Sequence, residues 1–174
     1  LLSLAIASLA AGQSVCAAVE KVYNEPDSVY IFSYAHPEDE GRSGLKFAWS
    51  PDGDKWLSVS DGFAYLKCDF GRWGAEKRMI KPLLEKAEDG RWYCRWQLTP
   101  SGKVWGTSHS SDLLKWAPQQ YVNAEKPAMP RLVTARQIVL DKDTLNGYMQ
   151  KVPYADIEQL IRFAEHKKFR DIQN

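Results

Sequence analysis

A seven-residue phrase that occurs twice limits the folds open to this 174-residue chain. The segment from Ser50 to Trp56 reads S-x-D-x-x-K-W, and the segment from Ser110 to Trp116 reads the same, sixty positions later. Similarity that returns at a fixed spacing is the sign of a repeated structural unit. We therefore interpret the sequence around the two phrases as two copies of one supersecondary unit.

The residues before each phrase repeat as well. An aromatic-rich run at 29–34 or 91–96 leads into a polar turn with glycine, and a second short run follows at 45–49 or 104–108. Runs of β-branched and aromatic residues between turn residues predict strands. Two copies of strand, turn, strand, aspartate turn and tryptophan are typical of two β-propeller blades. We therefore expect an incomplete propeller of two blades at 19–123, within an all-β fold that ends in a C-terminal helix.

The aspartates of the two phrases have a structural explanation. In Pro51-Asp52-Gly53, proline presets φ, the aspartate bonds N–H groups ahead of it, and glycine supplies a positive φ. We expect Asp52 and Asp112 to tie their own turns rather than to perform chemistry. Trp56 and Trp116 are expected to fill the space between adjacent blades.

Both ends of the chain differ from this repeat. Residues 1–18 are uncharged, rich in Ala and Leu, and end in small residues, which predicts a secretory signal peptide clipped at its start. We therefore expect a secreted or periplasmic protein with no membrane contact beyond that signal. Residues 124–174 predict a linker, a short strand at 133–140, a turn at 141–147 and a helix that begins at Pro153.

The predicted helix is amphipathic. Its apolar residues recur at helical spacing and form one stripe. The stripe consists of Ile157, Leu160, Ile161 and Ala164. Because the repeat stops after two copies, we expect this stripe to pack against the rest of a larger protein.

Composition and charge exclude some partners. The net charge is +1, which gives no reason to expect nucleic acid or a membrane surface. Twelve per cent of the residues are aromatic, and such rings either fill a β core or offer faces for sugars. The three histidines stand apart without metal-ligand spacing, so neither metal nor cofactor is expected. Cys68 and Cys94 form a disulfide or remain free, with Cys94 a small buried hydrophobe; both outcomes stay open.

Three stretches taken together resemble a known family. Gly44–Trp56, Lys77–Trp96 and Ser108–Trp116, in this order, are similar to the five-bladed propeller glycoside hydrolases, in particular those like glycoside hydrolase family 43. The similarity covers about residues 29–122. It implies an exported hydrolase of O-glycosyl bonds in plant-type polysaccharide, of the arabinofuranosidase or xylosidase kind. This chain would be its N-terminal part, with an oligo- or polysaccharide as partner.

The family's functional residues transfer poorly to this sequence. The family has an Asp before Pro in the second blade, where this chain has Lys81, and a cation cannot tune a general acid as a carboxylate does. The family's general base, an Asp followed by Pro, would fall near Asp27, but here the proline precedes the aspartate. The family's general acid, in the third blade, is not recognisable in this sequence. The candidates are therefore Asp27 as a catalytic residue, and Lys81, Trp73 and His36 as substrate-binding residues.

Several functional hypotheses stay open. Glycoside hydrolysis needs two carboxylates with different pKa values, and two blades of five do not supply them. The chain is therefore either part of a hydrolase, inactive alone, or a non-catalytic carbohydrate-binding propeller module. A purely structural β module is a third hypothesis. The charged turn at 36–44 would suit a sugar or a cation, but such runs are more often solvated. Sialidase turns of the form S-x-D-x-G-x-x-W fit less well, because Trp56 lies one residue too close.

Overall fold

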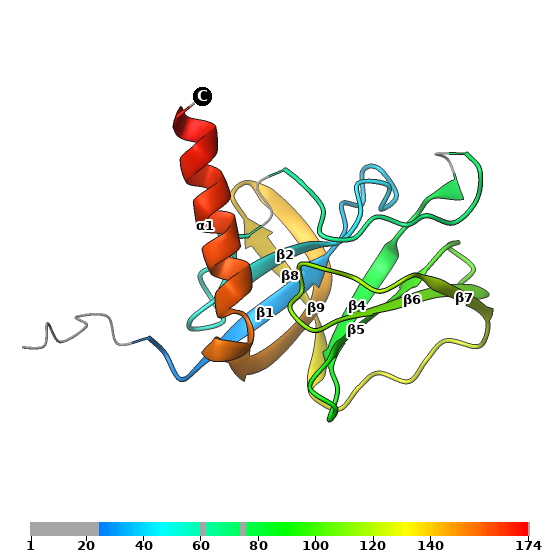
Figure 1. Cartoon of the computed structure of the whole chain (residues 1–174). Helices are drawn as coiled ribbons and strands as arrows, with labels where there is room; N and C mark the ends of the chain where they lie inside the picture. The colour runs from blue at the N-terminus through cyan, green and yellow to red at the C-terminus, as the bar shows by residue number, and fades with distance from the viewer. Residues whose placement is uncertain (1–24, 60–61, 74–75, 174) are drawn as a thin grey trace, which may run out of the picture.

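The computed structural model describes residues 25–59, 62–73 and 76–173, so the predicted signal peptide at 1–18 lies outside the described residues. Within them, nine strands form two antiparallel sheets, and one α-helix follows the last strand (Figure 1). The prediction of a mostly β fold with a C-terminal helix is confirmed. No helix in the described part of the chain is long and apolar enough to cross a membrane.

The first sheet has five strands in the order β3-β2-β1-β9-β8. These are β1 (Ser28–Tyr34), β2 (Lys46–Ser50), β3 (Leu57–Ser58), β8 (Val133–Leu140) and β9 (Asp143–Pro153). The strands predicted at 29–34, 45–49 and 133–140 are confirmed. Strand β9 pairs with β1 along the whole length of β1, from Ser28↔Pro153 to Tyr34↔Gly147.

The second sheet has four strands in the order β4-β5-β6-β7. These are β4 (Ile80–Lys86), β5 (Trp92–Gln97), β6 (Val104–Ser110) and β7 (Gln120–Asn123). The order β9-β1-β2-β3 within the first sheet matches the order β4-β5-β6-β7 of the second sheet. The repeat in the sequence thus corresponds to a repeat in strand order.

The turn predicted at 141–147 is wrong for most of its length. Strand β9 begins at Asp143, so the chain reverses between β8 and β9 at residues 141 and 142 alone. Gly147 lies inside β9, and a Cβ atom there would be 2.6 Å from Cζ of Phe32. A glycine inside a strand marks such a close approach. The segment Asp143–Gly147 has the composition of a turn, but it joins the first sheet because it lies beside β1.

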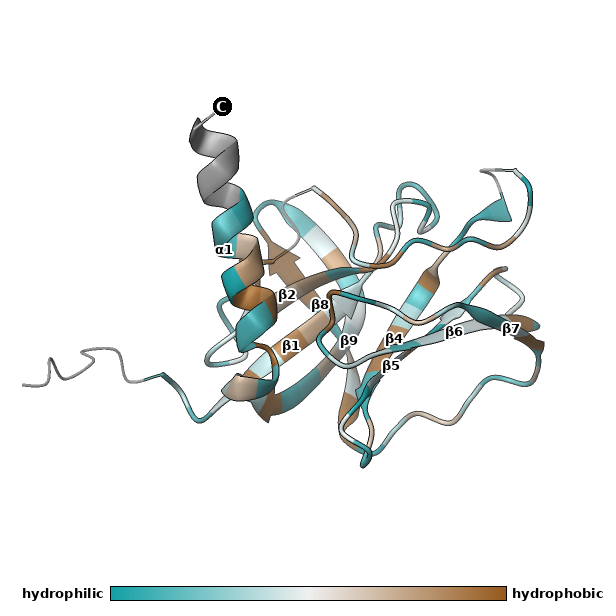
Figure 2. Cartoon of the chain, in the orientation of Figure 1, coloured by the Kyte–Doolittle hydropathy of each residue, from teal (hydrophilic) through white to brown (hydrophobic). Residues whose placement is uncertain are grey.

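The C-terminal helix packs on this chain. Helix α1 (Glu158–Gln173) begins after a 3₁₀ turn (Tyr154–Asp156) and not at Pro153, which ends β9. Its predicted apolar stripe is buried in the core that both sheets share. Figures 1 and 2 show α1 alongside β1 and β2. The predicted apolar stripe is therefore confirmed. The prediction that it packs against the rest of a larger protein is wrong, because these residues pack against this chain's own sheets.

Two apolar clusters lie on opposite faces of the first sheet. Successive β1 side chains point to opposite faces, so Ile31 enters the larger cluster and Phe32 the smaller one. Trp116 packs against the larger cluster, between the sheets, as expected. Trp56 packs against the smaller one, with its ring centroid 5.5 Å from that of Phe32. Trp56 therefore lies on the face of the first sheet opposite to the shared core, and its expected place between adjacent blades stays a prediction.

Cys68 and Cys94 are both buried and free, so the disulfide does not form. Cys94 has no exposed surface, and burial raises the pKa of its thiol. A thiolate is the reactive form of cysteine, so this raised pKa makes the thiol inert. Cys94 is thus the small buried hydrophobe that the sequence allowed.

Candidate functional site

The two repeated turns are held by the same hydrogen bonds. The Oγ of Ser50 or Ser110 accepts the N–H three residues ahead, at 2.8 Å in the first copy and 2.9 Å in the second. Oδ1 of Asp52 or Asp112 accepts the N–H groups two and three residues ahead, at 2.8–2.9 Å. Both aspartates therefore tie their own turns, as the sequence predicts.

These hydrogen bonds also fix the charge of both aspartates. N–H donation from Lys55, then from Asp54, lowers the pKa of Asp52 from 3.8 to about 2. Burial raises the pKa of Asp112, but N–H donation from Lys115 and the other turn hydrogen bonds outweighs it, so that pKa is lowered too. A carboxylate that stays ionised and bound to its own turn is a poor general acid or base at neutral pH. The repeated phrase is scaffold.

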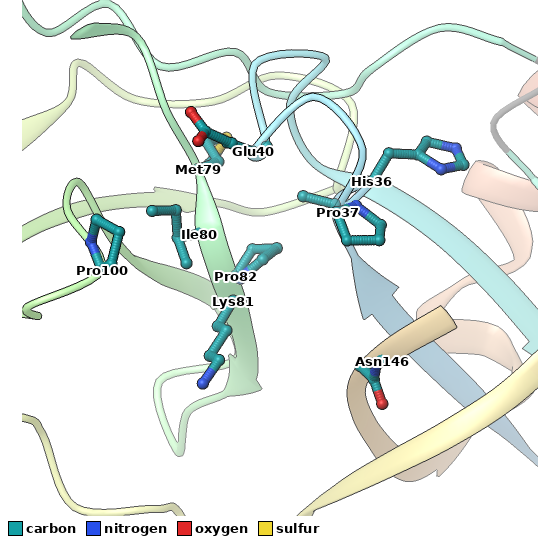
Figure 3. Close-up of a pocket in the computed structure, with 11 residues that line it drawn as sticks. His36, Pro37, Glu40, Met79, Ile80, Lys81, Pro82, Pro100 and Asn146 are labelled. Atoms are coloured by element: carbon teal, nitrogen blue, oxygen red, sulfur yellow. The ribbon is translucent and has the colours of Figure 1, made fainter. Parts of the chain in front are cut away.

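A cavity of about 310 Å³ opens where β1 ends and β4 begins (Figure 3). Its residues come from the loop after β1, the start of β4, the β5–β6 turn and strand β9. They are Ala35, His36, Pro37, Glu40, Gly41, Met79, Ile80, Lys81, Pro82, Pro100 and Asn146. Three prolines give it apolar walls, and His36, Lys81 and Asn146 add polar groups. Volumes of about 300–1,000 Å³ are usual for small-molecule sites.

The charged turn at 36–44 forms one wall of this cavity. Its Asp39 carboxylate accepts N–H groups of Gly41 at 2.9 Å and Ser43 at 2.8 Å. The N–H of Met79 donates to the Gly41 carbonyl at 3.1 Å, which binds the turn to the residue before β4. Gly41 has φ +77°, and a Cβ there would lie 2.6 Å from the Met79 carbonyl carbon, so glycine is required. The turn is thus held in place by hydrogen bonds, while Pro37, Glu38, Glu40 and Arg42 remain exposed to solvent.

Lys81 has a strained backbone at the cavity. Its φ is +50°, in the left-handed region that favours glycine. The cause is a β-bulge: Ile80 pairs with Gln97 and Leu83 with Arg95, so β4 uses one residue more than β5. The Oγ of buried Ser33 donates to the Pro82 carbonyl at 3.0 Å and holds the bulge against β1.

Non-glycine residues with positive φ are concentrated around the cavity. Glu40 has φ +55°, so two of the four non-glycine residues with positive φ in the described ranges line the same cavity. Such residues cost about 1–3 kcal/mol each and persist where the surrounding structure enforces them, often at functional sites. In Figure 3 the Glu40 carboxylate and the Lys81 ammonium point away from each other, on either side of Pro82.

The structure brings two of the four sequence candidates together. His36 and Lys81 line the cavity, and the His36 ring meets Tyr34 edge-on at 5.7 Å between centroids. Trp73 is 72% exposed in a loop after β3 and is not among the lining residues. Asp27 precedes β1 and accepts the N–H of Tyr154 at 3.1 Å through its carbonyl. The seven residues of β1, at about 3.3 Å each, place Asp27 roughly 23 Å from the cavity end of that strand.

The lining residues suit binding better than acid–base catalysis. Glu40 is the only carboxylate among them, and it accepts ion pairs from Arg42 at 2.9 Å and Arg78 at 3.0 Å. Two carboxylates across a scissile bond, as glycoside hydrolysis requires, are thus not found in the lining. The described residues also contain no group of three or more His, Cys, Asp or Glu side chains placed to hold a metal ion.

Sequence reasoning missed Pro100 and Asn146. Both line the cavity, yet Pro100 lies in the turn between β5 and β6, and Asn146 lies in the segment expected to be a turn. Their local sequence carries no sign of a site. The pairing of β9 with β1 and the packing of the two sheets bring them there.

Comparison with protein-family models, curated proteins and solved structures found no match to this chain. What the cavity does must therefore be inferred from its residues and their geometry.

Proposed function

We propose that this chain belongs to an exported protein similar to glycoside hydrolases, and that its described residues bind carbohydrate without cleaving it. The observation that carries the proposal is the cavity at the start of β4. It combines three proline faces with the polar groups of Lys81 and Asn146, while its one carboxylate is held by two arginines and the His36 ring points away from the cavity (Figure 3). Mostly apolar walls with a few convergent polar groups are the usual lining of small-molecule sites.

The architecture supports the same proposal. Four strands of the first sheet, β9-β1-β2-β3, share their order with β4-β5-β6-β7, and both sheets carry the same hydrogen-bonded turn, which favours an interpretation as two propeller-type blades. Strands β4 and β9 would then face the central channel side of such a fold, with β8 lying beyond β9 at the edge of the first sheet. The cavity includes residues at the start of β4 and within β9, so a ligand there would lie at the channel.

Cleavage is a second candidate, for a longer protein that contains this chain. The family resemblance favours it, because the related enzymes hydrolyse arabinosyl or xylosyl bonds. A hydrolase needs two carboxylates about 5–10 Å apart. Asp27 lies at the far end of β1, and Lys81 stands where the family has an acid. We therefore propose cleavage only with carboxylates from outside the described residues.

Calorimetric titration of the whole chain with xylo- and arabino-oligosaccharides tests the binding proposal. We expect saturable heat with Kd between about 1 μM and 1 mM, and no release of reducing ends. Asn146→Ala should weaken binding about fivefold, the value of one lost hydrogen bond. Trp73→Ala is the matched control: it removes an exposed aromatic ring outside the cavity and should leave Kd unchanged.

Three results would count against the proposal. Absence of heat for every oligosaccharide at millimolar concentration would remove binding as the function. Reducing ends released by the pure chain would make it an enzyme. Loss of affinity in Trp73→Ala but not in Asn146→Ala would move the sugar from the cavity to the exposed loop.

A further inference from the structure

We propose that the sugar bound here is anionic, and that Lys81, Lys126 and Arg136 bind its carboxylate or sulfate groups. This inference rests on the proposed carbohydrate binding and names the class of ligand. It concerns a basic groove, defined by three adjoining cavities that all include Lys81.

The groove continues from the cavity described above. A second cavity of about 430 Å³ shares Lys81 and Asn146 with the first. A third, of about 640 Å³, shares Lys81 and Pro100 with the first, and Lys81 and Lys126 with the second. Lys81 therefore stands where the three meet. A groove of three joined cavities suits several sugar residues of one chain better than a single small molecule.

Positive charge dominates this groove. The second cavity is lined by Lys81, Lys126 and Arg136, with no carboxylate among its lining residues. The third adds Lys103 and a single acid, Glu125. An anionic group of a ligand would be stabilised within about 4–6 Å of these cations, because no carboxylate in the lining of the second cavity competes for the cations.

The lysines of the groove have no partner of their own among the described residues. No ion pair or side-chain hydrogen bond is formed there by Lys81, Lys103 or Lys126. Arg136 has two weak partners: its guanidinium donates to Sδ of Met149 at 3.6 Å and lies 3.7 Å from Asp54, whose side chain is 84% exposed. The chain as a whole has a net charge of only +1, so these cations are a local concentration and not part of a generally basic surface.

The backbone of Lys81 is a second, independent observation. Glycine would hold φ +50° without strain, yet the position is occupied by a lysine whose backbone is fixed by the bulge and by Ser33. Figure 3 shows its ammonium directed away from Glu40, the carboxylate of the first cavity. A residue that costs stability and carries an unpaired charge at the junction of three cavities is explained by a ligand of opposite charge.

Neutral polar side chains in the groove suit the rest of a sugar. Gln137, Asn146 and Tyr148 line the second cavity beside the cations. Amide and hydroxyl groups donate and accept hydrogen bonds, as sugar hydroxyls require. Uronic acid sugars and sulfated sugars share this chemistry of an anionic group among hydroxyls, so the experiment must separate them.

The test is a titration of the whole chain with matched pairs of probes. Oligogalacturonate is compared with neutral galacto-oligosaccharide of equal length, and a sulfated galactan oligomer with its unsulfated form. We expect at least one acidic probe to bind about tenfold more tightly than its neutral partner in low salt. That preference should shrink in about 0.3 M NaCl, since salt screens exposed charges.

Two variants of Lys81 separate charge from structure. Lys81→Gln should weaken acidic-probe binding about fivefold, as for loss of one solvent-exposed ion pair, and leave neutral-probe binding unchanged. Lys81→Gly should lose the same affinity while the midpoint of thermal unfolding rises, because glycine relieves the positive φ. Lys142→Gln is the control: Lys142 lies in the β8–β9 turn and lines none of the three cavities.

Each outcome has one meaning. Tighter binding of the uronate alone, or of the sulfated oligomer alone, supports the inference and identifies the anion. Equal affinity for acidic and neutral probes overturns the inference but leaves carbohydrate binding intact. No binding of any sugar overturns the proposed function as well. An equal loss in Lys142→Gln and Lys81→Gln overturns the assignment of the groove.

Discussion

At the scale of single residues, the two turns of the repeat place different residues at the same position of positive φ. Gly53 and Leu113 occupy equivalent positions in the two turns, with φ of +86° and +63°. Glycine adopts this conformation freely, whereas leucine pays about 1–2 kcal/mol. Leu113 has no exposed surface, and burial of such a side chain contributes about 1.5–3 kcal/mol, which offsets the strain.

The turns were predictable because their chemistry is local: Asp52 and Asp112 bond residues within three positions in sequence. The strain at Lys81 was not predictable from the sequence. It depends on the extra residue of β4 relative to β5, and only pairing between the strands reveals that residue.

Acid should weaken the first turn in a defined pH window. The folded pKa of Asp52, about 2, lies below its ordinary value of 3.8. Its contribution to stability is therefore complete above pH 3.8 and is lost as the pH falls towards 2. Asp52→Asn should be less stable than the wild type at pH 6, and the difference should shrink between pH 4 and pH 2. Urea unfolding at several pH values measures this.

Glu38→Gln is the control for this acid prediction. The Glu38 side chain is exposed and forms no hydrogen bond or ion pair within the described residues, so its removal should change stability little at any pH. A stability gap for Asp52→Asn that stays constant from pH 6 to pH 2 would contradict the role given to the turn.

At the scale of elements, strand existence was easier to predict than strand pairing. β1, β2, β5 and β6 follow from aromatic and β-branched runs within one stretch of sequence. The pairing of β9 with β1 joins residues more than a hundred positions apart, as in Phe32↔Met149. Local composition at Asp143–Gly147 favours a turn, and this long-range pairing overrides it. Helix α1 shows the same pattern: spacing predicts its buried stripe but not the core it enters.

Loss of packing in α1 should destabilise the whole fold. Leu160 is 1% exposed and belongs to the core that both sheets share. Leu160→Ala should lower the free energy of unfolding by about 2–5 kcal/mol through the lost contacts and the cavity left behind. Glu165→Ala, an exposed position on the same helix, should cost less than about 0.5 kcal/mol. Similar midpoints for both variants in urea unfolding would mean that the helix does not pack here in solution.

At the scale of the whole molecule, the cavity exists because two sheets meet. Ser33 bonds the Pro82 carbonyl, and the Gln150 amide donates to the Leu84 carbonyl at 3.4 Å, so β1 and β9 are held against β4. Sequence reasoning placed His36 and Lys81 among the candidates, and they do lie together. The strand predicted at 29–34 already separates Asp27 from His36, and β1 does place them at opposite ends.

An NMR titration of the labelled whole chain with oligogalacturonate asks where the sugar makes contact. The structure gives three reporters on different elements: His36 after β1, Lys81 in β4 and Asn146 in β9. We expect their amide signals to shift most and to saturate together at one Kd. Saturable shifts around Trp73 or Asp27, with these three signals unmoved, would contradict a binding site between the two sheets.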